Sequence, residues 1–113
     1  MNLKMLRIAN RVRQMEFTNS EKITALFRAI ELGGEVGEAL NIVKKLEREY
    51  LEIEGTRATI NDLAEELADI IICCDLLAME CAINLSKAVE DKFNKTSDKL
   101  GLRTKLPMEL DNG

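Results

Sequence analysis

Histidine is absent from the 113-residue chain, and this absence removes several kinds of active site. Ser-His-Asp and Cys-His nucleophile systems use an imidazole as their general base, so both are excluded. Zinc sites of the HExxH type and di-iron bundles built on Glu-x-x-His are excluded for the same reason. Any catalytic or metal site in this chain must therefore be built from other side chains.

Proline and aromatic residues are scarce, with one proline and 4% aromatic residues. A β-sandwich or barrel needs many turns and many β-forming side chains, so the composition argues against both. Apolar residues make up 46% and charged residues 32%, which is an ordinary globular balance. We expect an all-α fold, with one helical domain over residues 1–101 and an irregular tail over residues 102–113.

Positive charge is not in excess, and the net charge of −4 gives no support for binding to nucleic acid. The N-terminus lacks the apolar core of a signal peptide. The apolar run from Ile70 to Ile83 is too short to span a bilayer, so no membrane partner is expected. Its cysteines, Cys73, Cys74 and Cys81, are odd in number, which indicates reduced core thiols in a cytoplasmic protein.

Helix caps and apolar spacing predict four helices. Their expected ranges are about 3–15, about 19 to 50 or 54, about 60–83 and about 87–100. A capping-box pattern at Thr18–Glu21 precedes the second helix, and Thr59 offers an N-cap for the third. Ser86 is expected to cap the fourth helix, which ends near Gly101 because glycine suits the residue after a helix.

The first helix is basic, because Lys4, Arg7, Arg11 and Arg13 precede any acidic residue. Such a run is usually a solvated face or an ion-pair partner for an acidic helix. We interpret it in one of these two ways.

The third helix is the most apolar part of the chain. Ile70 to Cys74 and Leu76 to Met79 cover nearly every direction around its axis. A helix that is apolar all round is buried on all sides, and three other short helices can hardly surround it. We therefore expect a four-helix-bundle-like chain that assembles with partner chains into a larger bundle, as a homodimer or homotetramer. A tight monomeric four-helix core is the alternative.

Acidic residues interrupt the apolar face of the second helix. At about 100° per residue, Phe27, Glu31, Glu35, Glu38 and Ile42 share one face. An ordinary amphipathic helix places its glutamates opposite its phenylalanines. Here the stripe is apolar at both ends and acidic in the middle, which is unusual for a solvated face.

The third helix repeats this arrangement, with Asp62, Glu66 and Asp69 on one face. Carboxylates three residues apart, as in Glu35 with Glu38 and Glu66 with Asp69, project from the same side of a helix. If the two pairs meet, four carboxylates lie within about 6 Å. At an effective dielectric of about 20, the like-charge repulsion would reach roughly 17 kcal/mol. That is comparable to the whole stability of a domain.

Such a cluster cannot stay ionised and unpaired, so protons, lysines or divalent cations must neutralise it. Lys44 and Lys45 lie beyond the stripe and not four residues after its acids, so local pairing is weak. All-oxygen ligands favour Mg²⁺ or Mn²⁺. The pattern therefore predicts a metal site, and solvated acids that pair with lysines are the alternative.

Gly33, Gly34 and Gly37 lie beside these acids in the second helix. Each glycine inside a helix costs roughly 1 kcal/mol relative to alanine. Close approach of another helix, a local kink or room for a ligand would each explain them. The run does not match the G-x-x-x-x-G-K-[ST] phosphate-binding loop.

Two short motifs resemble a known family. Glu35 to Glu38 (EVGE), followed by Glu66 to Asp69 (ELAD) in an apolar helix, resembles the E-x-x-E…E-x-x-D signature of the MazG-like all-α NTP pyrophosphohydrolases. That superfamily includes the dimeric dUTPases and the phosphoribosyl-ATP pyrophosphatases. The segment Lys92 to Ser97 is similar to a lysine–asparagine segment of many MazG-like proteins, although Ser97 stands where some members have arginine. The resemblance covers roughly residues 31–97.

The resemblance implies Mg²⁺ ligation by Glu35, Glu38, Glu66 and Asp69, with Mn²⁺ able to replace Mg²⁺. It implies hydrolysis of an NTP or dNTP between the α- and β-phosphates, which gives a nucleoside monophosphate and pyrophosphate. Glu35 or Glu38 would orient or deprotonate the attacking water.

Basic and amide side chains would contact the phosphates of such a substrate. The resemblance implies this role for Lys92 and Asn94, and Lys44, Lys45 and Lys95 are further candidates. Two other functions remain open. One is a non-enzymatic helical dimerisation or regulatory module, and the other is phosphoribosyl-ATP pyrophosphatase activity within the same superfamily.

Overall fold

The computed structural model describes residues 1–108, and all the regular structure in this range is helical. Four α-helices and one short 3₁₀ helix follow one another: α1 (Leu3–Met15), η1 (Ser20–Lys22), α2 (Ala25–Tyr50), α3 (Ile60–Glu80) and α4 (Leu85–Leu100). The all-α prediction is confirmed. Residues 102–108 form neither helix nor strand, and residues 109–113 of the expected tail lie outside the described part.

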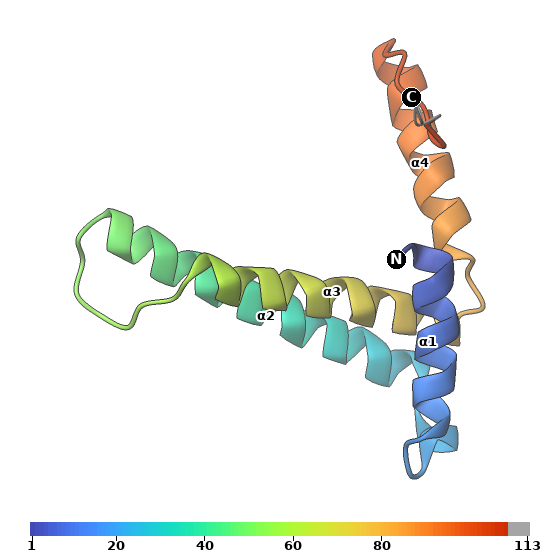
Figure 1. Ribbon diagram of the computed structural model, residues 1–113, viewed down its shortest axis with the longest axis horizontal. Helices are drawn as coiled ribbons and strands as arrows, with labels where there is room; N and C mark the ends of the chain where they lie inside the picture. Colours follow the sequence, from blue (N-terminus) through green and yellow to red (C-terminus); the bar gives the residue numbers. More distant parts are fainter. Residues whose placement is uncertain (109–113) are drawn as a thin grey trace.

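An antiparallel pair of long helices, α2 and α3, forms the framework of the molecule (Figure 1). Helix α1 crosses the end of this pair where α2 begins and α3 ends, and α4 leads away from that end beyond the start of α1. The radius of gyration is 17.8 Å, whereas a compact domain of this length has about 13 Å. The single chain is therefore extended and does not close into a compact four-helix bundle.

Each α-helix begins at a side-chain cap, which satisfies a backbone N–H that has no partner in the first turn. The caps are Asn2, Thr24, Thr59 and Asn84. The prediction for Thr59 is confirmed. Its hydroxyl accepts from the Asp62 N–H at 3.1 Å, and the Asp62 carboxylate accepts from the Thr59 N–H at 2.8 Å.

The predicted start of α2 is wrong. Residues 18–21 do not form a capping box, because Asn19 has a left-handed backbone (φ 63°) and Ser20–Lys22 form the separate turn η1. The helix begins at Ala25, with Thr24 as its cap. Thr24 has the extended backbone that a cap requires, and its hydroxyl accepts from the Phe27 N–H at 3.2 Å.

The predicted boundary between α3 and α4 also moves. Helix α3 ends at Glu80 rather than near Ile83, and Asn84 caps α4 in place of Ser86. The predicted end of α4 is confirmed, because Gly101 is left-handed (φ 68°). The following N–H, of Leu102, returns to the Ser97 carbonyl at 2.8 Å and closes the helix.

A buried ionic network fixes α1 against α3. The Asp75 side chain is 1% exposed, and Arg7 Nε lies 3.0 Å and 3.2 Å from its two oxygens. Asn10 Nδ2 donates to Asp75 Oδ2 at 2.9 Å, and Arg7 Nη2 donates to the Ile83 carbonyl at 2.7 Å. The basic first helix therefore does pair with an acidic residue of another helix, as one of the two interpretations expected.

Helix α3 is only partly covered within one chain. Leu67 and Ile71 are 50% and 49% exposed, and Ile60 at the start of the helix is also exposed. The chain exposes 8747 Å², whereas a compact monomer of 12.7 kDa exposes about 6,200 Å². The expectation that the other helices of one chain cannot surround α3 is confirmed. Within residues 1–108, no helix is both long and apolar enough to cross a membrane.

Candidate metal centre

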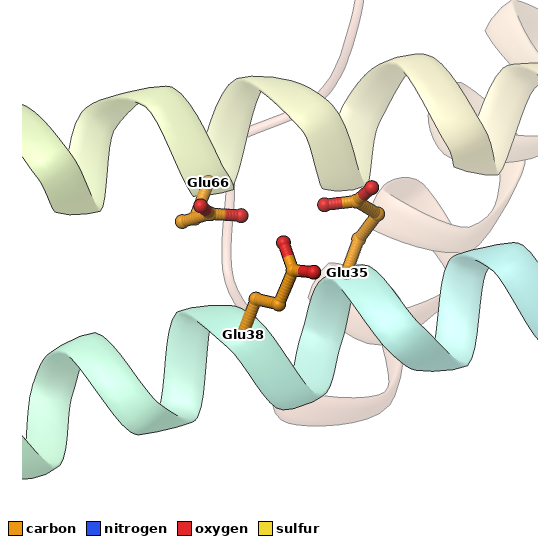
Figure 2. Close-up of side chains that lie close together, drawn as sticks. All are labelled: Glu35, Glu38 and Glu66. Carbon is orange, nitrogen blue, oxygen red and sulfur yellow. The ribbon is translucent and has the colours of Figure 1, made fainter.

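Three glutamates converge in the space between the two long helices. Glu35 and Glu38 extend from α2 and Glu66 from α3, and Figure 2 shows their carboxyl groups turned toward one another. Each residue offers one oxygen, and these oxygens lie within 4.8 Å of one another. The antiparallel packing of α2 and α3 therefore brings together three of the four acids that the sequence predicted to meet.

In two of these carboxylates, one oxygen lacks a partner among the described residues. Glu35 and Glu66 are half-buried, and their Oε2 atoms are buried without a hydrogen-bond partner among the described residues. A buried polar atom without a partner loses its hydration and gains nothing in return. Glu38 is exposed, so the group of three is open to solvent on that side.

The pKa values of the buried glutamates respond to this environment. Burial, followed by the charges of Glu38 and Asp69, raises the pKa of Glu35 to about 7. Burial also raises the pKa of Glu66, with Glu38 and Asp69 adding to the effect. Both shifts have the same physical origin, because a charged carboxylate is disfavoured by lost hydration and by neighbouring negative charge. Without a cation, the cluster retains protons near neutral pH.

Asp69 lies near the three glutamates without joining the closest group. It is exposed, and its oxygens are not among those that lie within 4.8 Å of one another. Its charge nevertheless raises the pKa of Glu35 and of Glu66. The fourth predicted ligand is therefore close enough to act electrostatically on the cluster.

No basic residue of residues 1–108 neutralises the three glutamates. The ion pairs in this range are Arg7–Asp75, Arg28–Glu31, Lys87–Asp91 and Lys105–Asp98. None of them includes Glu35, Glu38 or Glu66. The structure therefore does not contain the alternative arrangement, in which lysines of the same chain pair with these acids.

The predicted lysines of α2 lie farther along that helix. Lys44 lines a separate hollow with Leu40 and Leu51, and its direction is about 120° around the axis from Glu38. Lys45 is half-buried and, within the described part of the chain, forms no ion pair. Neither lysine belongs to the group of carboxylates in the single chain.

The predicted phosphate contacts of α4 lie on the helix that leads away from the α2–α3 pair (Figure 1). Lys92 and Lys95 are exposed. Asn94 holds the segment after α4, since its amide donates to the Leu106 carbonyl at 2.8 Å and accepts from the Leu106 N–H at 2.7 Å. One chain does not bring these three residues to the glutamates, and their role stays a prediction.

Arg28 was not singled out in the sequence. Its side chain is 5% exposed, and Nη1 pairs with Glu31 at 3.0 Å while Nη2 donates to Gln14 at 3.0 Å. Its Nε is buried without a partner among the described residues. The signal in the sequence is its spacing, because Arg28, Glu31 and Glu35 occupy successive turns of one helix face.

The donor set is restricted to oxygen. Burial, with the charges of Glu31 and Glu35, raises the pKa of Cys73 to about 11, so this thiol stays protonated at neutral pH. A thiol in that state is not a metal ligand. Carboxylates alone suit Mg²⁺ or Mn²⁺. The arrangement can therefore hold either a hard divalent cation or shared protons.

Comparisons with protein-family models, with curated proteins and with solved structures gave no match for this chain. The resemblance to MazG-like proteins therefore depends on the sequence motifs alone.

Proposed function

We propose that the protein is a Mg²⁺-dependent nucleoside triphosphate pyrophosphohydrolase of the MazG-like type. One observation carries the proposal: Glu35, Glu38 and Glu66 meet between two helices, and no basic residue of the described chain neutralises them. A divalent cation is the simplest partner for such a group. The order and spacing of the acidic motifs support the choice of family.

The buried oxygens provide a test of fit for the cation. Glu35 Oε2 and Glu66 Oε2 are buried and unpartnered, as ligand atoms would be before a cation binds. Glu35, Glu38 and Glu66 would hold Mg²⁺, and Asp69 would be the fourth ligand. Bound there, the cation would supply charge neutralisation for the triphosphate oxygens and a lowered pKa for a water molecule.

The protein's own part in the reaction is positioning and proton transfer. Glu38 is the exposed member of the group, so an incoming triphosphate reaches it first. The raised pKa of Glu35, about 7, belongs to the cation-free cluster, and a bound cation would favour the charged carboxylate. We assign the orientation or deprotonation of the attacking water to Glu35 or Glu38. The products would be a nucleoside monophosphate and pyrophosphate.

The exposed apolar surface supports assembly into a homodimer or homotetramer. The chain exposes about 2,500 Å² more than a compact monomer would, and a standard interface buries about 800 Å² on each partner. Leu26, Ile30 and Leu40 form an exposed stripe on α2, away from α3. Gly33 and Gly37 lie in the same stripe, with nothing within 4 Å of an added Cβ, so another helix can approach closely.

Sedimentation equilibrium tests the assembly directly. We expect a mass of two or four chains rather than 12.7 kDa. If Lys92, Asn94 and Lys95 contact the phosphates, the α4 helix that carries them would have to come from a second copy of the chain. A monomer at micromolar concentration would contradict this part of the proposal.

The decisive test of the activity is a substrate panel. The protein is incubated with each NTP and dNTP, dUTP and phosphoribosyl-ATP, with Mg²⁺ or with EDTA, and released pyrophosphate is measured. We expect pyrophosphate from at least one nucleotide, only with the divalent cation. Release from phosphoribosyl-ATP alone would select that alternative. Release of inorganic phosphate instead of pyrophosphate would refute the proposed cleavage position.

A non-enzymatic helical interaction module is the second candidate, and the apolar stripe of α2 favours it. This function requires assembly but no cation. A stable oligomer that neither hydrolyses any nucleotide nor binds Mg²⁺ would support it over the enzyme.

A further inference from the structure

A cavity of about 310 Å³ lies between α1, α2 and α3. Two of its wall residues are acidic, Glu31 and Asp69. Glu31 precedes Glu35 by one turn of α2, and Asp69 follows Glu66 by one turn of α3. The charge of Asp69 also raises the pKa of Glu35. On both long helices, the cavity wall is therefore one helical turn from the candidate metal centre.

Arg28 gives this cavity a specific chemical character. The residue is 4% exposed and lines the cavity, and two of its nitrogens are bonded to Glu31 and Gln14. The Nε–H is buried and has no acceptor among the described residues. A buried donor of a charged group that lacks an acceptor is costly, so an acceptor from outside the chain would be stabilised there.

The charges around the cavity select the acceptor. Two basic residues, Arg13 and Arg28, and two acidic ones, Glu31 and Asp69, line it, so the walls alone have no net charge. A divalent cation on the neighbouring glutamates makes the surroundings positive. An anion is then attracted, and the remaining guanidinium donor, the Nε–H, is suited to a phosphate oxygen.

The remaining walls are apolar and accept an organic group. Phe17, Ile72 and Leu76 line the cavity beside the arginines. A free phosphate ion would leave these side chains without a partner, whereas an organic phosphate would contact both kinds of wall.

We infer that the Arg28 Nε–H, assisted by Arg13, binds a phosphoryl group of an organic phosphate whose other oxygens share the cation with the glutamates. This inference rests on the proposed function, and it assigns a substrate-binding role to a residue outside the acidic motifs. Arg28 would hold one end of the polyphosphate while the cation holds another. Because the cavity walls alone have no net charge, we expect the anion to bind together with the cation and not before it.

Calorimetric titration with inorganic pyrophosphate tests the assignment without turnover. We expect wild-type protein to bind pyrophosphate in the presence of Mg²⁺ and not in EDTA. Arg28→Lys, which keeps the charge and loses the Nε–H, should weaken this binding at least about tenfold. Binding of Mg²⁺ alone should be unchanged in this variant.

Arg48→Lys is the matched control. Arg48 lies on the same helix and hydrogen-bonds to Thr56 at the far end, outside the cavity. This variant should bind pyrophosphate like the wild type. Equal pyrophosphate binding in wild type and Arg28→Lys would overturn the inference, as would no binding by the wild type.

A spectroscopic measurement on the wild-type protein covers the case in which Arg28→Lys does not fold. The ¹H–¹⁵N resonance of Arg28 Nε should move when pyrophosphate is added with Mg²⁺, and far less when Mg²⁺ is added alone. A purely structural arginine would give no response to pyrophosphate, and that result would contradict the inference.

The proposed function and this inference can fail separately. If no nucleotide is hydrolysed but Arg28→Lys still loses pyrophosphate binding, the phosphate site stands and the reaction is wrong. If nucleotides are hydrolysed and Arg28→Lys keeps the wild-type KM and pyrophosphate affinity, the reaction stands and Arg28 has only a structural role.

Discussion

Asp75 and Glu66 lie less than three turns apart on α3, and both face a neighbouring helix, yet their surroundings are opposite. Asp75 is fully buried and meets Arg7 and Asn10 of α1. Glu66 is half-buried and meets two glutamates of α2. The chain supplies a counter-charge to one acid and further negative charge to the other.

This difference separates a structural acid, Asp75, from an acid that we propose to bind the cation, Glu66, called here the binding acid. A buried carboxylate with a guanidinium and an amide holds helices together, because removal of any partner leaves an uncompensated group. A group of carboxylates without a cation opposes folding at neutral pH and becomes favourable only when protons or a metal bind. The same helix can therefore contain both kinds of site, and their mutants should respond in opposite directions.

The largest stability effect is expected at the structural acid. Asp75→Ala leaves the half-buried Arg7 and the buried Asn10 without their partner, which should cost about 3–5 kcal/mol of unfolding free energy. Urea unfolding followed by circular dichroism measures this loss. The matched control is Asp91→Ala, because the Lys87–Asp91 pair is exposed and should cost less than about 1 kcal/mol. Equal losses in the two variants would show that the buried network does not stabilise the fold.

The largest activity effect is expected at the binding acid. Glu66→Gln should lower pyrophosphate release by at least about 100-fold, since even the partners of metal ligands typically change activity 10- to 100-fold. The melting temperature without metal should stay equal or rise, because one negative charge leaves the cluster. Turnover and thermal melting are measured on the same preparation. Glu65→Gln, its exposed neighbour on α3, should retain full activity. An active Glu66→Gln protein would refute the ligand assignment.

Divalent cations should stabilise the wild type and not Glu66→Gln, which lacks one of the proposed metal-binding carboxylates. A ligand that binds only the folded state adds about 2.7 kcal/mol at 100 times its Kd. Differential scanning fluorimetry with Mg²⁺, Mn²⁺ or EDTA measures the shift in Tm. Glu66→Gln should lose most of the shift, and Asp91→Ala should keep it. A wild-type Tm that is independent of all divalent cations would contradict the metal centre.

The acidic cluster was predictable from the sequence, because helical periodicity alone places Glu35 and Glu38 on one face. Their meeting with Glu66 required that α2 and α3 pack antiparallel, which the nine-residue connection between them allows. The choice among neighbouring cap residues was not predictable, since Thr18 and Thr24 have the same side-chain chemistry and only Thr24 caps the helix.

The roles of Asp75 and Arg28 were not predictable from periodicity. Asp75 lies in the most apolar helix of the chain, and its partner Arg7 is far away in the sequence. Arg28 has an ordinary partner in Glu31, and only the three-dimensional packing reveals the free Nε beside a cavity. Tertiary contacts between distant segments determine both roles, so local spacing contains little information about them.

The pH dependence of stability is the smallest expected effect, and it gives the most specific test of the difference between Asp75 and the three glutamates. The folded-state pKa of Glu35 is about 7, above its ordinary value of 4.5, so folding favours the protonated form. Its contribution to stability is complete below about pH 4.5 and is lost as the pH rises through about 7. In EDTA, the wild type should therefore lose stability across this window, and Glu35→Gln should show a flatter profile.

The same titration predicts how the cation behaves, because metal and protons compete for the carboxylate oxygens. Mg²⁺ should stabilise the wild type more at pH 8 than at pH 5.5, and its binding near pH 7 should release protons into the buffer. Calorimetry in two buffers of different ionisation enthalpy measures that release. Asp75 provides the contrast, because its counter-charge is a guanidinium that stays ionised throughout this range. A wild-type profile in EDTA with the same slope as that of Glu35→Gln would show that this carboxyl group does not titrate in the window.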